Sequence, residues 1–314
     1  MRFFKNPNIN FLKYRKLLVS LSITLIIACV IVTIIQGVEY GIDFAGGTEV
    51  AVAVSKPIPT DQIRSAVTKA GLTDVEIKSF GEENQFLIRT IESTNAPELI
   101  TNALTQAFPN ENITILKVDK IGPKIGSDLR AQAFWAVFLA VIVMLIYLAF
   151  RFEFIFGLGA IVALVHDVIL TFTIAVTLNN LGIVNLEVNL SILAAILTVV
   201  GYSVNDTVII FDRIRENKER HKGMNFIKLA NLSINETLSR TVNTVFTTLL
   251  ALLSLFIFGG PVLQGFAFIM IIGIILGTYS SIFIASAFVI WYMEKIKKID
   301  LESGFREVIG AKVE

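Results

Sequence analysis

Six apolar stretches, each about as long as a membrane-spanning helix, constrain this 314-residue sequence more than any other feature. A hydrocarbon core of about 30 Å requires roughly 20 apolar residues in a helix. The stretches that qualify are residues 17–36, 131–150, 154–178, 190–211, 241–258 and 265–292. The composition, with 54% hydrophobic and only 17% charged residues, agrees with this interpretation. We therefore predict an α-helical polytopic membrane protein with six transmembrane helices and both termini on one side.

Lysine and arginine residues are distributed unevenly around these stretches. Five precede the first span, one lies in the turn at 151–153, seven lie between Arg213 and Arg240, and five follow Trp291. The short loops 179–189 and 259–265 contain none. Basic residues beside a span favour the cytoplasm. The pattern predicts cytoplasmic termini, formed by residues 1–16 and 293–314.

The first span could also be a processed leader. Its basic start and the sequence "IIAC" at 26–29 are superficially similar to a signal peptide with a lipoprotein cleavage box. However, the apolar run continues as "VIVTII" after Cys29, where a processed lipoprotein would turn polar. We expect an uncleaved anchor at 17–36. Cys29 is the only cysteine, so no intramolecular disulfide forms.

Residues 37–130 interrupt the membrane pattern and predict an external domain. Alternating hydrophobicity indicates strands at 48–54, 74–80, 85–91 and 112–121, and two helical segments, at 59–71 with Thr60 as N-cap and at 93–108, lie between them. The order βαββαβ is typical of an α+β, ferredoxin-like fold, here on the periplasmic side. This segment has no histidine, cysteine or ligand-spaced carboxylate cluster. It should therefore bind or move rather than catalyse.

Glycine-rich joints flank this domain, "GIDFAGGTEV" at 41–50 and "IGPKIGSDL" at 121–129. Gly46, Gly47, Gly122 and Gly126 could permit hinge motion. They could equally form tight turns into a strand. Glycine content alone leaves both interpretations open.

Polar residues inside the predicted spans are the candidate functional groups. They are His166 and Asp167 in the third span, Ser203, Asn205 and Asp206 in the fourth, and Arg240 and Asn243 at the start of the fifth. A charge at the centre of the hydrocarbon costs at least about 2.5 to 3.5 kcal/mol, so such residues usually face a partner or water. The alternative is that the fourth span ends before Asp206 and the sequence continues as a juxtamembrane helix.

Depth makes Asp206 and Arg240 candidates for an ion pair. Asp206 lies in the cytoplasmic third of its span, and Arg240 enters the membrane from that side. Arginine favours the carboxylate and burial favours the neutral acid, so proton binding could open and close the pair. His166 and Asp167 are candidates for a relay or a supporting hydrogen-bond network. Sodium coupling is an open alternative, because Asn205, Ser203 and Thr207 offer further oxygen atoms beside Asp206.

Residues 212–240 form a cytoplasmic segment with mixed charges. We expect a solvated loop followed by an amphipathic interfacial helix at about 225–238. The sequence contains no Walker motif, zinc signature or nucleophile constellation. It therefore predicts neither an enzyme nor a cofactor or metal site.

Four motifs together resemble the SecD/SecF family within the resistance-nodulation-division superfamily. They are "GIDFAGGTEV", "ALVHDV", "VVGYSVNDTVIIFDRIREN" and "LSRTVNT", and the resemblance covers nearly the whole chain. It implies a multi-pass protein of the bacterial inner membrane that works with SecD, beside the SecYEG channel and the SecA motor. It also implies that the proton gradient drives late export of unfolded preproteins, without nucleic acid, and that the external domain changes orientation. The fourth-span aspartate and fifth-span arginine associated with proton passage in that family match Asp206 and Arg240.

Two other classes of function remain open. A permease of small molecules or lipids within the same superfamily would need a substrate pocket. A scaffold of the translocon would support export without carrying protons, and its export would not respond to the gradient. Copurified partners would separate the export hypotheses from the permease.

Overall fold

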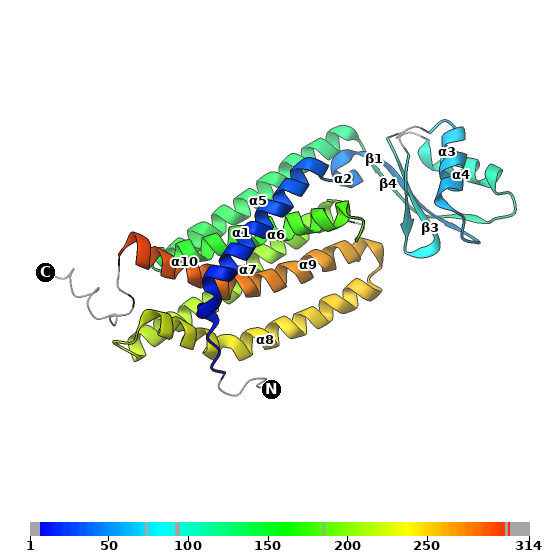
Figure 1. Cartoon of the computed structure of the whole chain (residues 1–314). Helices are drawn as coiled ribbons and strands as arrows, with labels where there is room; N and C mark the ends of the chain where they lie inside the picture. The colour runs from blue at the N-terminus through cyan, green and yellow to red at the C-terminus, as the bar shows by residue number, and fades with distance from the viewer. Residues whose placement is uncertain (1–6, 73–74, 92–94, 185, 299–300, 302–314) are drawn as a thin grey trace.

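The computed structural model describes residues 7–72, 75–91, 95–184, 186–298 and 301. It consists of a helical bundle with an α/β domain at one end (Figure 1). The start of the first long helix and the end of the last lie at the opposite end of the bundle. Residues 1–6 and 302–314 of the predicted cytoplasmic termini lie outside the described residues.

Six helical runs are long and apolar enough to cross a membrane, which confirms the predicted number of spans. The first five consist of a 3₁₀ turn η1 (Phe11–Tyr14) with α1 (Arg15–Gln36), then α5 (Pro123–Arg151), α6 (Phe154–Asn180), α7 (Leu190–Arg220) and α8 (Phe226–Phe258). The sixth run continues from α9 (Gly260–Ser280) through a π-helical turn η2 (Ser281–Ala285), α10 (Ser286–Trp291) and a second π-helical turn η3 (Tyr292–Ile296). Helix α7 is unbroken from Leu190 to Arg220, so Asp206 lies within the same helix as the fourth apolar run.

The α/β domain has the predicted βαββαβ order. After a short helix α2 (Ile42–Ala45), it comprises β1 (Gly47–Val54), α3 (Thr60–Lys69), β2 (Glu76–Phe80), β3 (Glu82–Thr90), α4 (Ala96–Ala107) and β4 (Ile113–Ile121). The strands form an antiparallel sheet in the order β2-β3-β1-β4. The ferredoxin-like fold is therefore confirmed. Thr60 is not the N-cap, because the Pro59 carbonyl already accepts from the amides of Gln62 and Ile63 and Thr60 is the first helical residue.

Each face of the sheet has a different role, as the alternation of its residues requires. Val50, Val52 and Ile88 are buried beneath α3 and α4. Charged residues occupy the opposite face, and this face and the connection between α6 and α7 together line a cavity of 260 Å³. The charged face of the sheet therefore looks toward the helical bundle.

The bundle is built on α6, α7 and α9. Half or more of the most apolar part of these three spans is buried, against 11% or less in α1, α5 and α8. Gly273 and Gly277 lie one helical turn apart on α9, where a side chain would collide with Val199 or press on Ser203 of α7. Small residues at this spacing let two helices approach closely in a membrane.

The segment after the fourth span differs from the prediction of a solvated loop at 212–224. Helix α7 continues to Arg220, and its last turns carry ion pairs at helical spacing between Arg213, Glu216 and Arg220. Helix α8 begins at Phe226 and runs without interruption into the membrane, so the expected interfacial helix is the first part of the fifth span. Its early turns are held against α7 by a hydrogen bond of 3.0 Å from Asn217 to Ser233. This side-chain packing favours helix over loop.

The glycine joints are packed tightly against their neighbours. Gly46 and Gly47 have positive φ angles of 79° and 125°, and a side chain on either would lie within 2.8 Å of backbone atoms of Pro123 or Thr90. A Cβ added to Gly126 would lie 3.0 Å from the backbone nitrogen of Gly46, whereas a Cβ added to Gly122 would meet no atom within 4 Å. Three of the four positions thus favour the tight-turn interpretation over a loose hinge. Helix α5 begins at Pro123, directly after Gly122, whereas the external domain was predicted to extend to residue 130.

A clamp on α8 holds the chain ahead of α1. The Asn235 side chain accepts a hydrogen bond from the Ile9 amide at 2.8 Å and donates one to the Ile9 carbonyl at 2.9 Å. Asn231 binds the same carbonyl and the Phe11 amide. Leu12 is fully buried beside these contacts. Residues 9–12 are therefore fixed to the end of α8 that lies away from the α/β domain.

Candidate functional site

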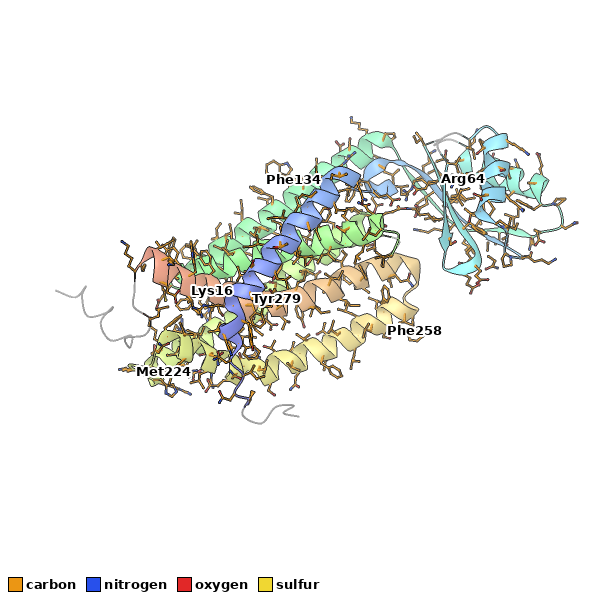
Figure 2. The ribbon with its side chains drawn as sticks, in the orientation of Figure 1. Lys16, Arg64, Phe134, Met224, Phe258 and Tyr279 are labelled. Carbon is orange, nitrogen blue, oxygen red and sulfur yellow. The ribbon has the colours of Figure 1, made fainter. Side chains whose placement is uncertain are left out.

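The bundle encloses two carboxylates, Asp167 on α6 and Asp206 on α7, which are 0% and 3% exposed. Tyr279 of α9, labelled in Figure 2, lies at about the same level, roughly midway along the bundle. In the same view, Met224 marks the turn before α8 and Phe258 marks the other end of that helix. Both carboxylates are therefore buried among the helices of the bundle.

Asp167 is saturated with hydrogen bonds. One oxygen is 2.8 Å from Nδ1 of His166, and the other accepts from Ser203 at 2.5 Å and Ser280 at 2.6 Å. These three contacts engage both oxygens of Asp167. Nε2 of His166 is buried, with no hydrogen-bond partner in the described part of the chain. The predicted His166–Asp167 pair is real, and its environment is that of a stable network joining α6, α7 and α9.

Asp206 has poorer surroundings. Within the described ranges, its side chain accepts one hydrogen bond, a long one of 3.3 Å from Thr278 of α9. Thr207 is 2.8 Å from Ser281, whose hydroxyl also donates to the Gly277 carbonyl. A buried carboxylate with little hydrogen bonding is costly to keep charged. Asp206 is therefore a buried carboxylate with fewer hydrogen-bond partners than Asp167 among the described residues.

Arg240 does not reach Asp206 in this structure. Its side chain is exposed, and among the described residues no carboxylate lies within 4.0 Å of it. Its charge is still close enough to act electrostatically on the Asp206 carboxylate. The expected ion pair is open here, and its closing remains a prediction.

The remaining predicted residues, Ser203, Asn205 and Asn243, do not gather around Asp206. Ser203 belongs to the Asp167 network, whereas Asn205 is exposed on the flank of α7. Asn243 is half-buried on α8, one helical turn after Arg240. The oxygen atoms expected to bind sodium are consequently not gathered around Asp206.

Sequence reasoning missed the contribution of α9. Thr278, Ser280 and Ser281 provide hydroxyls to both carboxylate regions, and the Tyr279 hydroxyl binds Ser22 and the Leu18 carbonyl of α1. The signal was present as "TYSS" in the middle of the sixth apolar run. The π-helical turn η2 begins at the last of these residues. Such turns interrupt regular α-helices frequently at functional sites.

A second polar site, which we call the sheet–loop cluster, joins the α/β domain to the bundle. Its members are two cations of the sheet and four surrounding carboxylates: Lys78, Arg89, Glu39, Glu49, Glu76 and Glu187. Lys78 contacts Glu39, Glu76 at 2.9 Å and Glu187 at 2.7 Å. Arg89 contacts Glu49 at 2.9 Å, Glu76 at 3.0 Å and Glu187. Both cations are mostly buried.

Electrostatics hold this cluster together. Burial by itself would raise the pKa of Glu39, but hydrogen bonds from Lys78 and Asn179 outweigh it and lower the pKa to about 2. Burial would lower the pKa of Lys78, yet its hydrogen bonds to Glu187 and Glu39 hold that pKa above its usual range. The carboxylates of Glu39, Glu76 and Glu187 lie close enough to ligate a metal ion. The Lys78 ammonium already occupies the position between them, so these residues do not fit a metal.

Comparisons with protein families give two matches. A family described as "Protein export membrane protein SecD/SecF, C-terminal" matches residues 100–295. The "SecD/SecF GG Motif" matches residues 31–58, which include Gly46 and Gly47.

Individual relatives cover almost the whole chain. Two relatives described as "Protein translocase subunit SecF", from Rhodothermus marinus and Calditerrivibrio nitroreducens, are each 42% identical to this chain. The matches cover 92% and 90% of this chain and 95% and 94% of the relatives' own lengths. A crystal structure of SecDF from Thermus, described as a translocon-associated membrane protein, has a TM-score of 0.82 and 34% identity over 92% of this chain. SecDF in a super-membrane-facing form has a TM-score of 0.68, with 33% identity over 94%. This chain spans only 39% and 40% of those two SecDF chains.

Proposed function

Because this chain belongs to the SecD/SecF family of protein-export membrane proteins, we propose that it works with SecD and uses the proton gradient to promote preprotein export across the bacterial inner membrane. The observation that carries the proton-driven step is the environment of Asp206. This carboxylate is buried in the bundle, has one long hydrogen bond and lies within the electrostatic reach of Arg240. A group so placed responds strongly to a proton.

The proposed step is a change in the charge of Asp206. In the charged state the carboxylate attracts Arg240 across the gap between α7 and α8. A proton that arrives from outside neutralises Asp206, removes this attraction and lets the two helices separate. Its release to the cytoplasm restores the attraction. A membrane potential of 100 mV supplies about 2.3 kcal/mol per charge, which biases a two-state change more than tenfold.

The flank of α7 and α8 supports assembly with a second polypeptide. Asn205 on α7 and Arg240 on α8 are both exposed, although both helices are long and apolar enough to cross a membrane. Polar groups at that depth are expensive against lipid, so they normally face protein or water. We assign this flank to the contact with SecD. Proximity to SecYEG and SecA, and the cytoplasmic placement of both termini, belong to the same proposal through family resemblance and the distribution of charge.

The test is an Asp206→Asn variant in membrane vesicles that contain the complete translocation complex. We expect normal assembly with SecD and a fall of at least tenfold in gradient-dependent export, down to the level seen without a gradient. Asp212→Asn is the matched control, because Asp212 pairs with Arg151 at 2.5 Å near the end of the bundle. Full gradient-dependent export by the assembled Asp206→Asn protein would contradict the proposal. Wild-type export that ignores the gradient would favour a scaffold.

A further inference from the structure

Glu187 connects the helical bundle to the sheet of the α/β domain through ion pairs. It lies in the loop between α6 and α7 and is 13% exposed. Its carboxylate contacts Lys78 of β2 at 2.7 Å and Arg89 of β3. Two strands of the domain are therefore tied to one residue of the loop.

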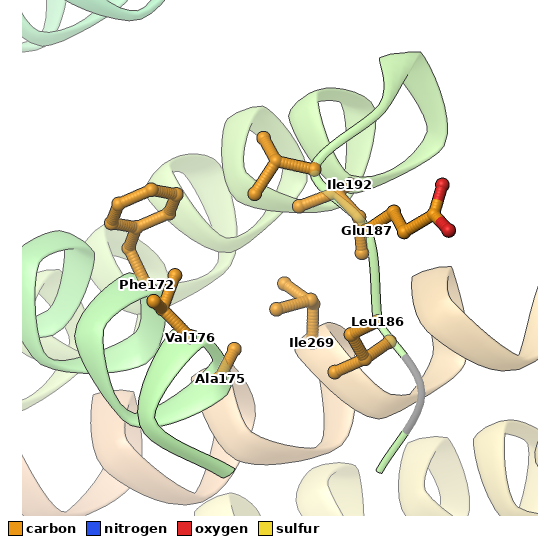
Figure 3. Close-up of a pocket in the computed structure, with 8 residues that line it drawn as sticks. Phe172, Ala175, Val176, Leu186, Glu187, Ile192 and Ile269 are labelled. Atoms are coloured by element: carbon orange, nitrogen blue, oxygen red, sulfur yellow. The ribbon is translucent and has the colours of Figure 1, made fainter. Parts of the chain in front are cut away.

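The same loop is anchored in the bundle from its other side. Leu186 and Val188 pack against an apolar group formed by α6, α7 and α9 that includes Ala175, Ile192 and Ile269. Figure 3 shows Leu186 directed toward Ile269, whereas the carboxylate of the adjacent Glu187 points away from this group. Only a small cavity of 10 Å³ remains among these side chains. The loop is thus packed firmly on the helices while it holds the sheet.

Backbone contacts fix the chain that enters the domain to this loop. Tyr40 and Val188 form a parallel bridge, with hydrogen bonds of 3.0 Å from the Gly41 amide to the Val188 carbonyl and 2.9 Å from the Val188 amide to the Glu39 carbonyl. Asn179, near the end of α6, donates to Glu39 at 2.8 Å. The attachment therefore combines ion pairs with backbone pairing.

The two helices joined by this loop carry the buried carboxylates. Asp167 lies on α6 and Asp206 on α7, about 26 Å along the helix from Asn189 at a rise of 1.5 Å per residue. A shift of α7 along its axis would consequently reach the loop directly. The closely packed glycine joints restrict movement of the domain relative to α1 and α5.

On the basis of the proposed function, we infer that the sheet–loop cluster is a rigid coupling joint that transmits movement of α6 and α7 to the external domain. Glu187, Lys78 and Arg89 are positioning residues, which act on export through the orientation of the domain. The joint stays closed through the cycle, and the domain moves together with the loop.

A Glu187→Gln variant separates coupling from proton movement, because it keeps the size of the side chain and removes its charge. In vesicles with the complete complex, we expect proton flux within twofold of wild type and gradient-dependent export lowered at least fivefold. Glu111→Gln is the matched control, since it removes an ion pair with Lys56 inside the same domain and should change neither quantity. Normal export by Glu187→Gln would overturn the proposal. So would a parallel loss of proton flux, export and assembly, which would indicate a purely structural role.

A disulfide tests whether the joint remains closed. A Cβ on Gly41 would lie 3.1 Å from the Cβ of Asn189, a few tenths of an ångström below the range of about 3.5 to 4.5 Å in a disulfide. A small outward shift at Gly41→Cys with Asn189→Cys should therefore allow a cross-link on oxidation. We expect the oxidised and reduced proteins to export equally. Export lost on oxidation and recovered on reduction would show that the joint must open. If Asp206→Asn abolishes export while Glu187→Gln does not, the coupling fails and the proposed function stands.

Discussion

At the scale of single residues, the two buried carboxylates differ in what surrounds them. Asp167 receives three hydrogen bonds, two of them from serines on neighbouring helices. Asp206 has the 3.3 Å contact with Thr278 and the distant Arg240. Hydrogen bonds stabilise buried polar groups, so Asp167 is held in a network that joins three helices. Asp206 has no comparable set of partners among the described residues, which fits the change of charge proposed for it.

Glu39 allows a prediction about pH outside the membrane. Its pKa falls from 4.5 to about 2 when Lys78 and Asn179 bind the carboxylate. A group with a lowered pKa stabilises the folded state above its unfolded value, and this contribution is lost as the pH falls through the folded value. The contribution of Glu39 to docking should therefore be constant from pH 8 to 5 and disappear between about 4.5 and 2.

The measurement is protection of the Val188 amide from hydrogen exchange, compared at each pH between wild type and Glu39→Gln. The variant has no charge to lose, so its protection should be lower at neutral pH and should converge with wild type near pH 2. A difference that persists at pH 2 would contradict the assignment.

Residue types identified the polar groups, but orientation could not be predicted from them. The sequence located Asp206, Arg240 and the His166–Asp167 pair, because charges in an apolar run stand out. Asn205 was grouped with Asp206 although successive helix positions differ by about 100° in direction. Thr278, Ser280 and Ser281 were missed, since hydroxyl residues are common in apolar helices and their partners lie on other helices.

At the scale of helices and strands, the contact between α7 and α9 determines where the buried groups meet. Gly273 sits directly against Val199, and Gly277 against Ser203, which binds Asp167. Because Gly273 and Gly277 have no side chains, α9 packs close to α7. The hydroxyl groups of α9 therefore come within reach of α6 and α7.

A Gly273→Ala substitution should separate these helices. Its Cβ would lie 2.2 Å from a methyl group of Val199, which is stiff and 1% exposed. Overpacking of this kind costs about 1 to 3 kcal/mol. Gly201→Ala is the control, because a Cβ there meets nothing within 4 Å, and alanine is about 0.8 to 1 kcal/mol more favourable than glycine in a helix. Thermal unfolding in detergent should show a lower Tm for the first variant and an equal or higher one for the second.

The helices and strands could be predicted where the pattern of hydrophobic residues alone determines them. The number of spans and the βαββαβ order of the domain followed from period and length. The continuation of α7 to Arg220 and the unbroken α8 did not, because mixed charges indicate a loop when read locally. Ion pairs one turn apart and the Asn217–Ser233 contact stabilise helix there, and such contacts depend on tertiary structure.

At the scale of the whole molecule, the α/β domain and the turn between α7 and α8 lie at opposite ends of the bundle (Figure 1). Cys29 is 6% exposed, so the chain offers a background of low thiol reactivity. Cysteines introduced at the exposed positions Lys56 and Lys222 can report on each end. We expect a membrane-impermeant maleimide to label Lys56→Cys from the periplasm, and Lys222→Cys only after the inner membrane is opened. The reverse pattern would invert the proposed orientation.

The clamp on α8 sets an order of events during synthesis. Ile9 binds the side chain of Asn235, which lies 226 positions later in the chain. At about 5 to 20 residues per second, a ribosome needs roughly 11 to 45 seconds to produce that partner after Ile9. The first span therefore takes up its orientation in the membrane long before residues 9–12 can form their final contacts with α8. The positive charges beside the span are already synthesised at that stage and can set its orientation.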